Sequence, residues 1–291
     1  MSLGSKKYKG FLKQIVIKIT SLVPYKIKLF LYKVPLVSFL IRKFLNFSLS
    51  SPEKISTAKI VSGPIKSYKI GIDFQSEKYY WLGTHEPKVQ QIILKVAKRG
   101  MAIYDIGAHI GYFTILFSHL CKRKGKVFAF EPNPDNFQRL VQNIALNKIE
   151  NIFPIKIAVA EKNGIVFFDK TESNSQSRLV GEQKPGDGGE NIIKVETESL
   201  DGFVYKGKNP LPQIVKIDVE GAEGKVIKGM KRILREVRPL IICEIHNLEA
   251  AQEIWQVMGE GNYTFFDIEK GLSKINDFKN YQGGHIMAQP L

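Results

Sequence analysis

The stretch from residue 101 to residue 133 constrains the fold of this chain more than any other. Its sequence, MAIYDIGAHIGYFTILFSHLCKRKGKVFAFEPN, contains an apolar run that ends at Asp105, a turn bracketed by Gly107 and Gly111, a helical pattern over Tyr112–Lys122, and a second apolar run that ends before Glu131. This order predicts a strand, a glycine turn, a helix and a second strand. Such a unit is half of a nucleotide-binding α/β fold.

Three features of this unit indicate which ligand it takes. Gly107 has no Cβ that would hold the chain away from a ligand, and the N–H groups at the start of the following helix favour an anionic group. Glu131 stands where an acid accepts hydrogen bonds from two ribose hydroxyls. A dinucleotide site usually has the pattern G-x-G-x-x-G, but Ala108 and His109 follow Gly107 here. The unit therefore favours S-adenosylmethionine, which has an amino-acid tail and no phosphate, and an α/β sheet without a ligand stays open as the alternative.

The composition fits one large domain with an extension. The chain has 291 residues, of which 44% are hydrophobic, enough for a substantial core. Its two cysteines, Cys121 and Cys243, exclude a disulfide framework and a zinc cluster and favour a reducing, cytoplasmic compartment. The net charge of +15 is typical of nucleic-acid-binding proteins, but ten of these charges lie in residues 1–52, which contain no acid.

The basic N-terminal segment interleaves cations with large apolar residues from Lys6 to Phe47. The apolar spacing is largely helical, and Pro24 and Pro35 divide the segment into short amphipathic pieces. No uncharged run approaches the ~20 residues that span a bilayer, and lysines inside the apolar part do not fit a secretory signal. Two interpretations stay open. The segment adsorbs to anionic lipid, which makes the protein peripheral at the inner face of the membrane, or it packs on the core with a solvated basic face.

The remaining chain alternates strand and helix patterns. Short β-rich pieces between Lys59 and Trp81, including KYYWLG, predict a small hairpin, and a helix is expected over Glu86–Arg99. Further elements are expected at Pro134–Asn147 (helix), Phe153–Ala160 (strand), Ile165–Phe168 and Ile192–Glu196 (hairpin strands), Ile214–Met230 (strand, turn and helix), Pro239–His246 (strand), Leu248–Met258 (helix), and Tyr263–Ile268 and His285–Ala288 (strands). This alternation predicts a doubly wound, mostly parallel sheet. The polar loop Thr171–Glu190 is a candidate lid or a disordered insertion.

Acidic residues and a histidine follow the ends of the apolar strands. Ligands of open α/β sheets bind beyond the carboxyl ends of the strands, so these side chains are expected to share one cleft with the glycine turn. Residues two apart on a strand share a face, which pairs Glu244 with His246 and Lys216 with Asp218. Glu223 is interpreted as a structural residue, whose negative charge interacts favourably with the positive N-terminal end of its helix dipole.

Methyl transfer to a hydroxyl benefits from a positioned acceptor and from a base. His246 is one candidate base, because histidine titrates near neutral pH and Glu244 could orient it. Asp218 is the other, because it lies next to the glycine turn. In the alternative, Asp218, Glu220, Glu244 and His246 hold Mg²⁺, which acidifies the hydroxyl.

Several motifs in this order resemble the FkbM-type S-adenosylmethionine-dependent methyltransferases. They are YWLG at residues 80–83 with Glu86, DIGAHIGYFTILFS and FEPNP in the first half, and VKIDVEGAEGKVIKGM and EIH in the second. The resemblance covers Ser62 to His246 and, more loosely, the C-terminal stretch, but not residues 1–50. It implies an α/β class I methyltransferase fold, a Rossmann-like, mostly parallel seven-stranded sheet with helices on both faces. It also implies O-methylation of a saccharide, glycolipid or other small hydroxylated metabolite.

The resemblance places S-adenosylmethionine against Asp105, Gly107, Gly111, Glu131 and Asp218. Neighbouring positions complete the expected cofactor site: Glu86, Ala108, Tyr112, Phe113, Thr114, Pro132, Asn133, Asn136 and Ala158. The expected catalytic residues are Lys216, Asp218, Glu244 and His246. The expected domains are the extension 1–50 and a methyltransferase domain 51–291, made of a hairpin and lead-in helix (51–100) and a core (101–291).

Two other classes of protein stay open from the sequence. An RNA methyltransferase would use the basic segment to bind phosphates, although the chain lacks an N-P-P-Y-like motif and the aromatic spacing is that of helix faces. A non-catalytic, membrane-associated protein that binds the cofactor is the third class, and the acids at every strand end argue against it.

Overall fold

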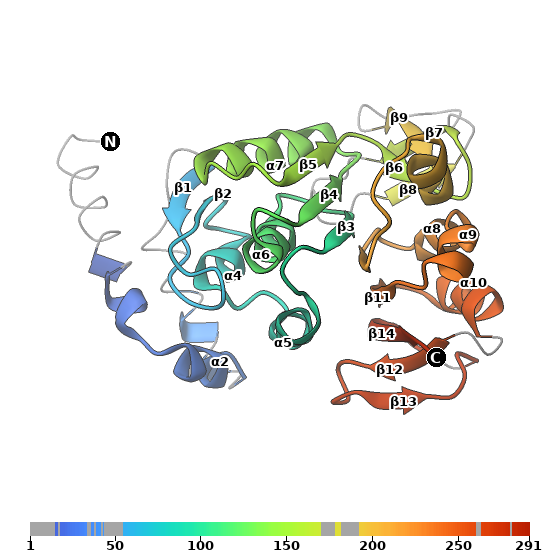
Figure 1. Ribbon diagram of the computed structural model, residues 1–291. Coiled ribbons are helices and arrows are strands. Elements are labelled where there is room, and N and C mark those ends of the chain that lie inside the picture. Colours follow the sequence, from blue (N-terminus) through green and yellow to red (C-terminus); the bar gives the residue numbers. More distant parts are fainter. Residues whose placement is uncertain are drawn as a thin grey trace. The chain divides into compact units, whose positions relative to one another are not determined.

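The computed structural model describes residues 15–16, 18–33, 36–37, 39–41, 43, 55–169, 178–181, 192–259, 263–279 and 281–291. The chain divides into two compact units, Met1–Gln90 and Gln91–Leu291 (Figure 1). The first unit therefore contains the expected hairpin as well as the described part of the basic segment. The separate domain predicted for residues 1–50 stays a prediction.

The first unit contains short elements. Helix α2 spans Tyr25–Lys33, and residues 15–16 and 18–22 before it are also helical. A hairpin is formed by β1 (Ser56–Lys59) and β2 (Lys69–Ile72), which pair antiparallel, so its first strand begins before the range predicted from Lys59 to Trp81. None of the helices in the described ranges combines the length and the apolar character that crossing a membrane requires.

One expectation for this unit is wrong. The KYYWLG piece was expected to be β-rich, but Lys78–Leu82 forms the short helix α4. The helix ends at Gly83, whose left-handed φ of 72° lets its N–H donate to the carbonyls of Tyr79 and Tyr80. Aromatic residues favour strands on average, but the glycine cap and the burial of Trp81 on the unit's core decide for a helix.

The second unit is built on an eight-stranded sheet, shown in Figure 1. Its strands are β3 (Ala102–Ile106), β4 (Lys126–Phe130), β5 (Ile152–Ile155), β10 (Ile214–Ile217), β11 (Leu240–Ile245), β12 (Tyr263–Asp267), β13 (Ser273–Ile275) and β14 (Gly284–Pro290). The order is β13-β12-β14-β11-β10-β3-β4-β5. Strands β5, β4, β3, β10 and β11 are mutually parallel, whereas β14 runs antiparallel to β11 and β12. The strands expected in this sheet are present except that β5 is shorter than predicted, and β13 adds a short edge strand that the sequence did not predict.

The strand order places a topological switch point between β3 and β10. From β3 the chain proceeds to β4 and β5 on one side, and it returns to β10 and β11 on the other. Ligands of open α/β sheets bind at such a point, outside the carboxyl ends of the strands. The residues that follow β3, β4, β10 and β11 therefore surround one site.

Helices pack on this sheet. They are α6 (Tyr112–Cys121), α7 (Pro134–Leu146), α8 (Glu223–Lys228), α9 (Lys231–Glu236) and α10 (Leu248–Met258). The helix expected over Glu86–Arg99 is α5, which spans Pro87–Val96. Helix α6 contacts β3 and β4. Apolar residues of α8, α9 and α10 instead share a core with alternate strand residues such as Tyr104, Ile217 and Cys243. The alternation follows from the two-residue period of a strand, which sends successive side chains to opposite faces.

A second, four-stranded sheet has the order β6-β9-β7-β8. Its strands are β6 (Ala158–Val159), β7 (Gly164–Asp169), β8 (Arg178–Gly181) and β9 (Ile192–Glu198), and a π-helix follows at Gly202–Lys206. The predicted hairpin strands are β7 and β9, which pair antiparallel.

The single strand expected over Phe153–Ala160 is wrong. The chain leaves the main sheet after Ile155 and enters the smaller sheet at Ala158, where β6 pairs with β9. A continuous apolar run cannot show that its two halves pair with different partners. The candidate lid Thr171–Glu190 lies outside the described residues except for β8.

Candidate active site

Gly107 begins the turn after β3 in a left-handed conformation, with φ of 79°. A Cβ at this position would lie 1.8 Å from the carbonyl oxygen of Asp218. The N–H groups of Gly107 and Ala108 donate to the carbonyl of Phe130 at 3.0 and 2.9 Å. Glycine is thus required here because the backbone after β10 approaches the turn. This is a second reason for glycine, beside the ligand access that the sequence predicted.

Gly111 closes the same turn and is the N-cap residue of α6, with φ of 91°. A Cβ there would lie 2.6 Å from Cδ1 of Leu140 on α7. Both glycines of the predicted cofactor turn therefore have a backbone conformation that favours glycine, but only at Gly107 does the close approach involve backbone, because the end of the Leu140 side chain can shift.

Glu131 follows β4 and is 5% exposed. Its two oxygens accept hydrogen bonds from the backbone N–H groups of His109 and Asn133, each at 2.8 Å. Burial raises the pKa of Glu131 to about 7, although these hydrogen bonds and one from Asn136 lower it. The carboxylate is thus fixed in direction between the glycine turn and the start of α7.

The expected cofactor residues Pro132 and Asn133 connect Glu131 to the start of α7. Asn133 is the N-cap of α7, and its side chain accepts the N–H groups of Asp135 and Asn136. Pro132 is half-buried between Glu131 and this cap. The FEPNP motif therefore combines an acid at the strand end with a helix cap that holds it.

A buried charged group lies between β3 and β10. Asp105 is fully buried, and its Oδ2 accepts the hydroxyl of Thr114 at 2.5 Å. Nζ of Lys216 lies 3.0 Å from Oδ2 of Asp218, 4.0 Å from Oδ1 of Asp105 and 5.0 Å from the ring centre of Phe113. Lys216 therefore balances two acids on neighbouring strands, which offsets the cost of burying them.

His246, at the end of β11, lies among four carboxylates. Its Nδ1 is 2.7 Å from Oε1 of Glu223. Its Nε2 lies 3.4 Å from Glu220, 3.8 Å from Glu244 and 4.0 Å from Asp218. We refer to Asp218, Glu220, Glu223, Glu244 and His246 as the acid–histidine cluster.

The pKa values in this cluster differ from those of isolated side chains. Burial lowers the pKa of His246, but the hydrogen bond to Glu223 and the nearby carboxylates outweigh this effect and raise it to about 9. His246 is thus protonated at neutral pH, unlike the base near its ordinary pKa that the sequence suggested. Burial and the neighbouring acids raise the pKa of Glu220 to about 7, although His246 opposes the shift. Glu220 is the group of this pair that exchanges a proton near neutral pH.

Sequence reasoning missed two partners in this region. Glu223, which is fully buried in the first turn of α8, orients His246, a role that the sequence suggested for Glu244. His285 on β14 lies opposite Glu244 in the strand register, with Nε2 3.3 Å from Oε2 of Glu244 and Nδ1 3.2 Å from Glu269. The pairing of β14 with β11 creates this second contact, and no local pattern predicts that register.

Replacing Glu223 with glutamine is expected to lower the pKa of His246 from about 9 toward its ordinary value of 6.5, because the strongest stabilising partner of the imidazolium is lost. A raised pKa stabilises the folded protein fully below pH 6.5, and this contribution is lost as the pH rises through about 9. NMR titration of the His246 ring in EDTA-treated protein measures the shift, and Glu249→Gln, an exposed acid on α10, is the control. An unchanged pKa in Glu223→Gln would contradict the observed geometry as the cause.

Three further expected cofactor residues have contacts within their own units. Glu86 belongs to the first unit, where it lies 2.9 Å from Nε2 of His85. Ala158 lies in β6 of the smaller sheet and packs against Val195. Tyr112 is buried and makes an edge contact with Phe113. For these residues a cofactor role stays a prediction.

The acid–histidine cluster also has the donors for a cation. Asp218, Glu244 and His246 each offer one ligand atom, and these atoms lie within 4.8 Å of one another. Two carboxylates and an imidazole suit Mn²⁺ or Fe²⁺ at least as well as Mg²⁺, which prefers oxygen ligands.

Comparison with known proteins identifies the family. Residues 105–265, more than half of the chain, match the methyltransferase FkbM domain. The chain belongs to the FkbM methyltransferase family. The FkbM chain is 32% identical over 193 residues to the hexuronic acid methyltransferase AglP of Haloferax volcanii, an alignment that covers 66% of this chain and 75% of that protein.

Two further similarities are narrower or more distant. The tRNA (guanine(37)-N(1))-methyltransferase Trm5b of Pyrococcus abyssi is 40% identical over 63 residues, which are 22% of this FkbM chain and 18% of that enzyme. The crystal structure of methyltransferase FkbM from Methylobacillus flagellatus aligns with a TM-score of 0.43 and 15% identity, over 89% of this chain and 60% of that one.

The family confirms the predicted enzyme class. The protein is an S-adenosylmethionine-dependent methyltransferase, and the order β5-β4-β3-β10-β11-β14-β12 with antiparallel β14 is the expected seven-stranded class I sheet, to which β13 is added. The non-catalytic alternative is therefore set aside.

Proposed function

We propose that this FkbM methyltransferase methylates a hydroxyl oxygen of a saccharide. The observation that carries the proposal is the acid–histidine cluster, which lies at the carboxyl ends of β10 and β11 beside the turn at Gly107. A hydroxyl has a proton that must leave during methylation, and this cluster can take it. The relative AglP is a hexuronic acid methyltransferase, which makes uronic-acid saccharides the first acceptors to test.

The cofactor fits the residues on the β3 and β4 side of the switch point. Glu131 would bind the two ribose hydroxyls, because its carboxylate is fixed by two N–H groups and buried. The turn from Gly107 to Gly111 would lie along the amino-acid tail. Bound there, S-adenosylmethionine supplies an electrophilic methyl group on a sulfonium.

The acceptor proton would pass to a carboxylate rather than to imidazole. His246, with a pKa of about 9, already holds a proton at neutral pH, whereas Glu220, with a pKa of about 7, exchanges one readily. Asp218, ion-paired with Lys216 at 3.0 Å, would hold the acceptor hydroxyl by a hydrogen bond. Protonated His246 would keep the carboxylates together, since its Nε2 lies within 4.0 Å of three of them.

A second form of the same site holds a divalent cation on Asp218, Glu244 and His246. The proximity of their three ligand atoms favours it. Such a cation would polarise the acceptor hydroxyl and take over part of the role of the base. Activity after EDTA treatment, with and without added Mg²⁺ or Mn²⁺, distinguishes this form from the metal-free one.

A methyl-transfer assay over three acceptor classes tests the proposal. Uronic-acid oligosaccharides, neutral oligosaccharides and tRNA are each offered with labelled S-adenosylmethionine. Transfer to a saccharide supports the proposed function, with a preference for the uronic acids expected. Transfer to tRNA alone would favour the RNA methyltransferase alternative instead.

Replacing Glu131 with alanine is expected to weaken cofactor binding by about 1.5 to 3 kcal/mol, the range for hydrogen bonds to a charged group. Isothermal titration at pH 8, where Glu131 with its pKa of about 7 is ionised, measures the change. Glu150→Ala removes an exposed acid paired with Arg123 and serves as the control. An affinity equal to that of the wild type would remove Glu131 from the ribose role.

A further inference from the structure

The described part of the N-terminal segment exposes an unusual number of large apolar side chains. Ile15, Ile19, Leu22, Ile27, Phe30, Leu36, Phe39 and Leu40 are between 38% and 75% exposed. They make up eight of the fifteen exposed large hydrophobic residues found in the described ranges, although the segment is a small part of the chain. Single exposed apolar residues are ordinary, but a concentration of this kind indicates an interaction surface.

Helix α2 exposes apolar side chains and buries a lysine, the reverse of the pattern expected for a helix with one face on a core and the other in water. Ile27 and Phe30, which lie one turn apart on the same side, are 48% and 66% exposed, whereas Lys28 is 8% exposed. A helix packed on a core would bury the apolar pair and expose the lysine. The interpretation that this segment only packs on the core with a solvated basic face therefore does not account for α2.

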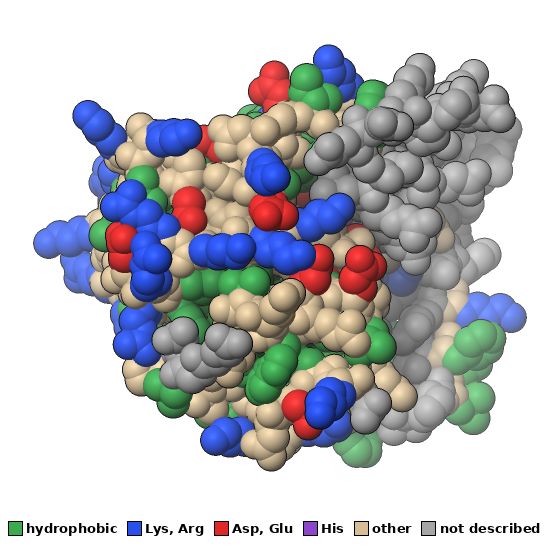
Figure 2. Space-filling view, turned by 90° about the vertical axis from the view of Figure 1, so that its right-hand side faces the viewer, with side chains coloured by type: hydrophobic (Ala, Val, Ile, Leu, Met, Phe, Trp, Pro, Cys, Tyr) green, Lys and Arg blue, Asp and Glu red, His purple; other side chains and the backbone are tan. Residues whose placement is uncertain are grey.

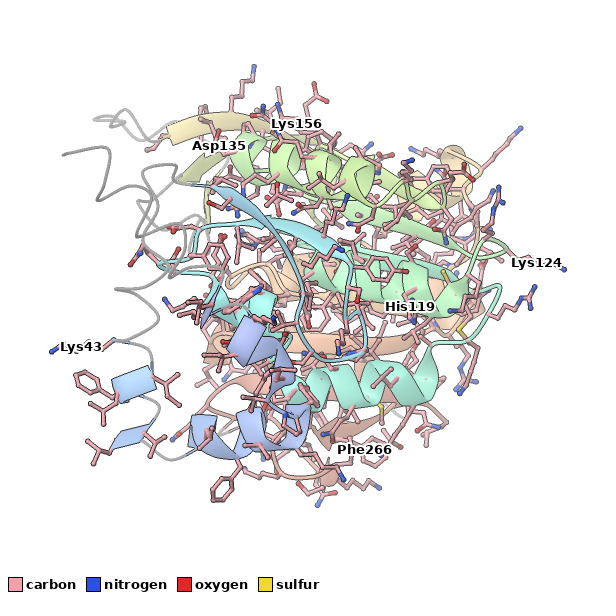
Figure 3. All side chains as sticks on the ribbon, turned by 90° about the vertical axis from the view of Figure 1, so that its left-hand side faces the viewer. Lys43, His119, Lys124, Asp135, Lys156 and Phe266 are labelled. Carbon is pink, nitrogen blue, oxygen red and sulfur yellow. The ribbon has the colours of Figure 1, made fainter. Side chains whose placement is uncertain are left out.

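The charge of the segment defines the chemistry of its partner. Residues 1–52 contain ten cations and no acid. Lys18, Lys26 and Lys43 are exposed, and Lys43 extends outward from the ribbon in Figure 3. The face of the protein in Figure 2, by contrast, intersperses Lys and Arg with Asp and Glu. A partner for the segment must therefore be both anionic and apolar.

Lys28 and a nearby cavity point to a phosphate-type group. Nζ of Lys28 is buried and has no hydrogen-bond partner among the described residues. Burial and the charge of Lys66 lower the pKa of Lys28 to about 8, so two cations stand close together. A cavity of about 420 Å³ in the same unit is lined by Lys59, Lys66 and hydroxyl side chains such as Ser21 and Ser67, together with apolar residues such as Ile60, Phe74 and Trp81. Its lysines and hydroxyls are donors that can bind a phosphate, and its apolar residues suit a lipid better than a free anion.

We propose that the described residues between Ile15 and Lys43 dock on the surface of an anionic phospholipid bilayer, with Ile27 and Phe30 inserted in the interface and Lys18, Lys26 and Lys43 at the lipid phosphates. Each Lys or Arg near such a surface contributes about 1 kcal/mol, and the apolar side chains add the burial of their surface. RNA offers phosphates too, but it gives exposed isoleucine and leucine side chains no apolar partner, because single strands bind by stacking on aromatic rings. The docking does not depend on which acceptor the active site methylates.

Co-sedimentation of the full chain with phosphatidylcholine vesicles, with and without phosphatidylglycerol, tests the proposal. The wild type is expected to bind only the anionic vesicles and to release as salt approaches 1 M, where the Debye length is about 3 Å. Ile27→Glu/Phe30→Glu is expected to weaken this binding by about tenfold or more. Both side chains are exposed, so the fold is preserved, which thermal melting followed by circular dichroism checks.

The matched control is Leu94→Glu/Leu211→Glu, which adds the same two charges at exposed leucines outside the segment and is expected to bind like the wild type. Equal binding of the wild type and Ile27→Glu/Phe30→Glu would overturn the proposal, as would equal binding to neutral and anionic vesicles. Absence of vesicle binding together with binding of a single-stranded RNA oligonucleotide would assign the segment to nucleic acid. Each of these results leaves the proposed methylation untouched, so the two proposals fail separately.

Discussion

Replacing His246 with alanine is expected to lower kcat by about 10²- to 10⁴-fold, the range for losing general acid–base catalysis, because the proposed base Glu220 loses the imidazolium that holds it 3.4 Å away. The variant removes the charge that offsets Asp218, Glu220 and Glu244, all of which lie within 4.0 Å of Nε2. Asp218→Asn is expected to have a comparable effect, because it loses the ion pair with Lys216 at 3.0 Å and the proposed hydrogen bond to the acceptor. Affinity for S-adenosylmethionine should change by no more than about threefold in His246→Ala, since the proposed cofactor residues are untouched.

Initial rates at saturating cofactor and isothermal titration measure the two quantities separately. Asp277→Asn, an exposed aspartate in the second unit, is the control. Full activity in both His246→Ala and Asp218→Asn would remove the acid–histidine cluster from the reaction. Loss of wild-type activity in EDTA and its return with Mg²⁺ or Mn²⁺ would assign the cluster to a cation instead.

Replacing Gly107 with alanine is expected to destabilise the protein by about 2 to 5 kcal/mol. The new Cβ would lie 1.8 Å from the carbonyl oxygen of Asp218, so the backbone between β3 and β10 must move. Forced packing of this kind costs about 1–3 kcal/mol, and the left-handed φ of 79° adds about 1–2 kcal/mol for a residue with a Cβ. Urea unfolding measures the loss.

Gly100→Ala separates the two causes. Gly100 has a similar left-handed φ of 87°, but a Cβ there meets nothing within 4 Å. This control should therefore lose only the conformational part, about 1–2 kcal/mol. If both variants were equally destabilised, close approach at the switch point would not be the reason for glycine at position 107.

The acids at the strand ends could be predicted from the sequence because their placement follows from two local rules. Apolar runs of strand length end at Asp105, Glu131, Asp218 and Glu244, and parallel strands bring their carboxyl ends to one edge. The glycine turn after β3 added an expected position for the cofactor, which stays a prediction. These rules need no knowledge of packing between distant segments, so they also predicted the mostly parallel sheet.

The partners of His246 could not be predicted in the same way. Glu223 lies 23 residues earlier, and it reaches His246 only because α8 packs beside β11. His285 reaches Glu244 through the register of an antiparallel strand pair. The raised pKa of His246 is the sum of these tertiary contacts, so the ordinary pKa of histidine was a poor guide. The strand prediction for Lys78–Leu82 was wrong for a related reason. Packing and a glycine cap make this segment the helix α4, although its aromatic residues prefer strands on average.

Transfer of a labelled methyl group to a uronic-acid oligosaccharide, with its position located by NMR, tests the central claim most directly. The wild type is expected to place the label on a sugar oxygen. His246→Ala is expected to bind S-adenosylmethionine but to transfer methyl groups at a rate lower by about 10²-fold or more. A label found on tRNA and on no saccharide, or a His246→Ala variant as active as the wild type, would contradict the account.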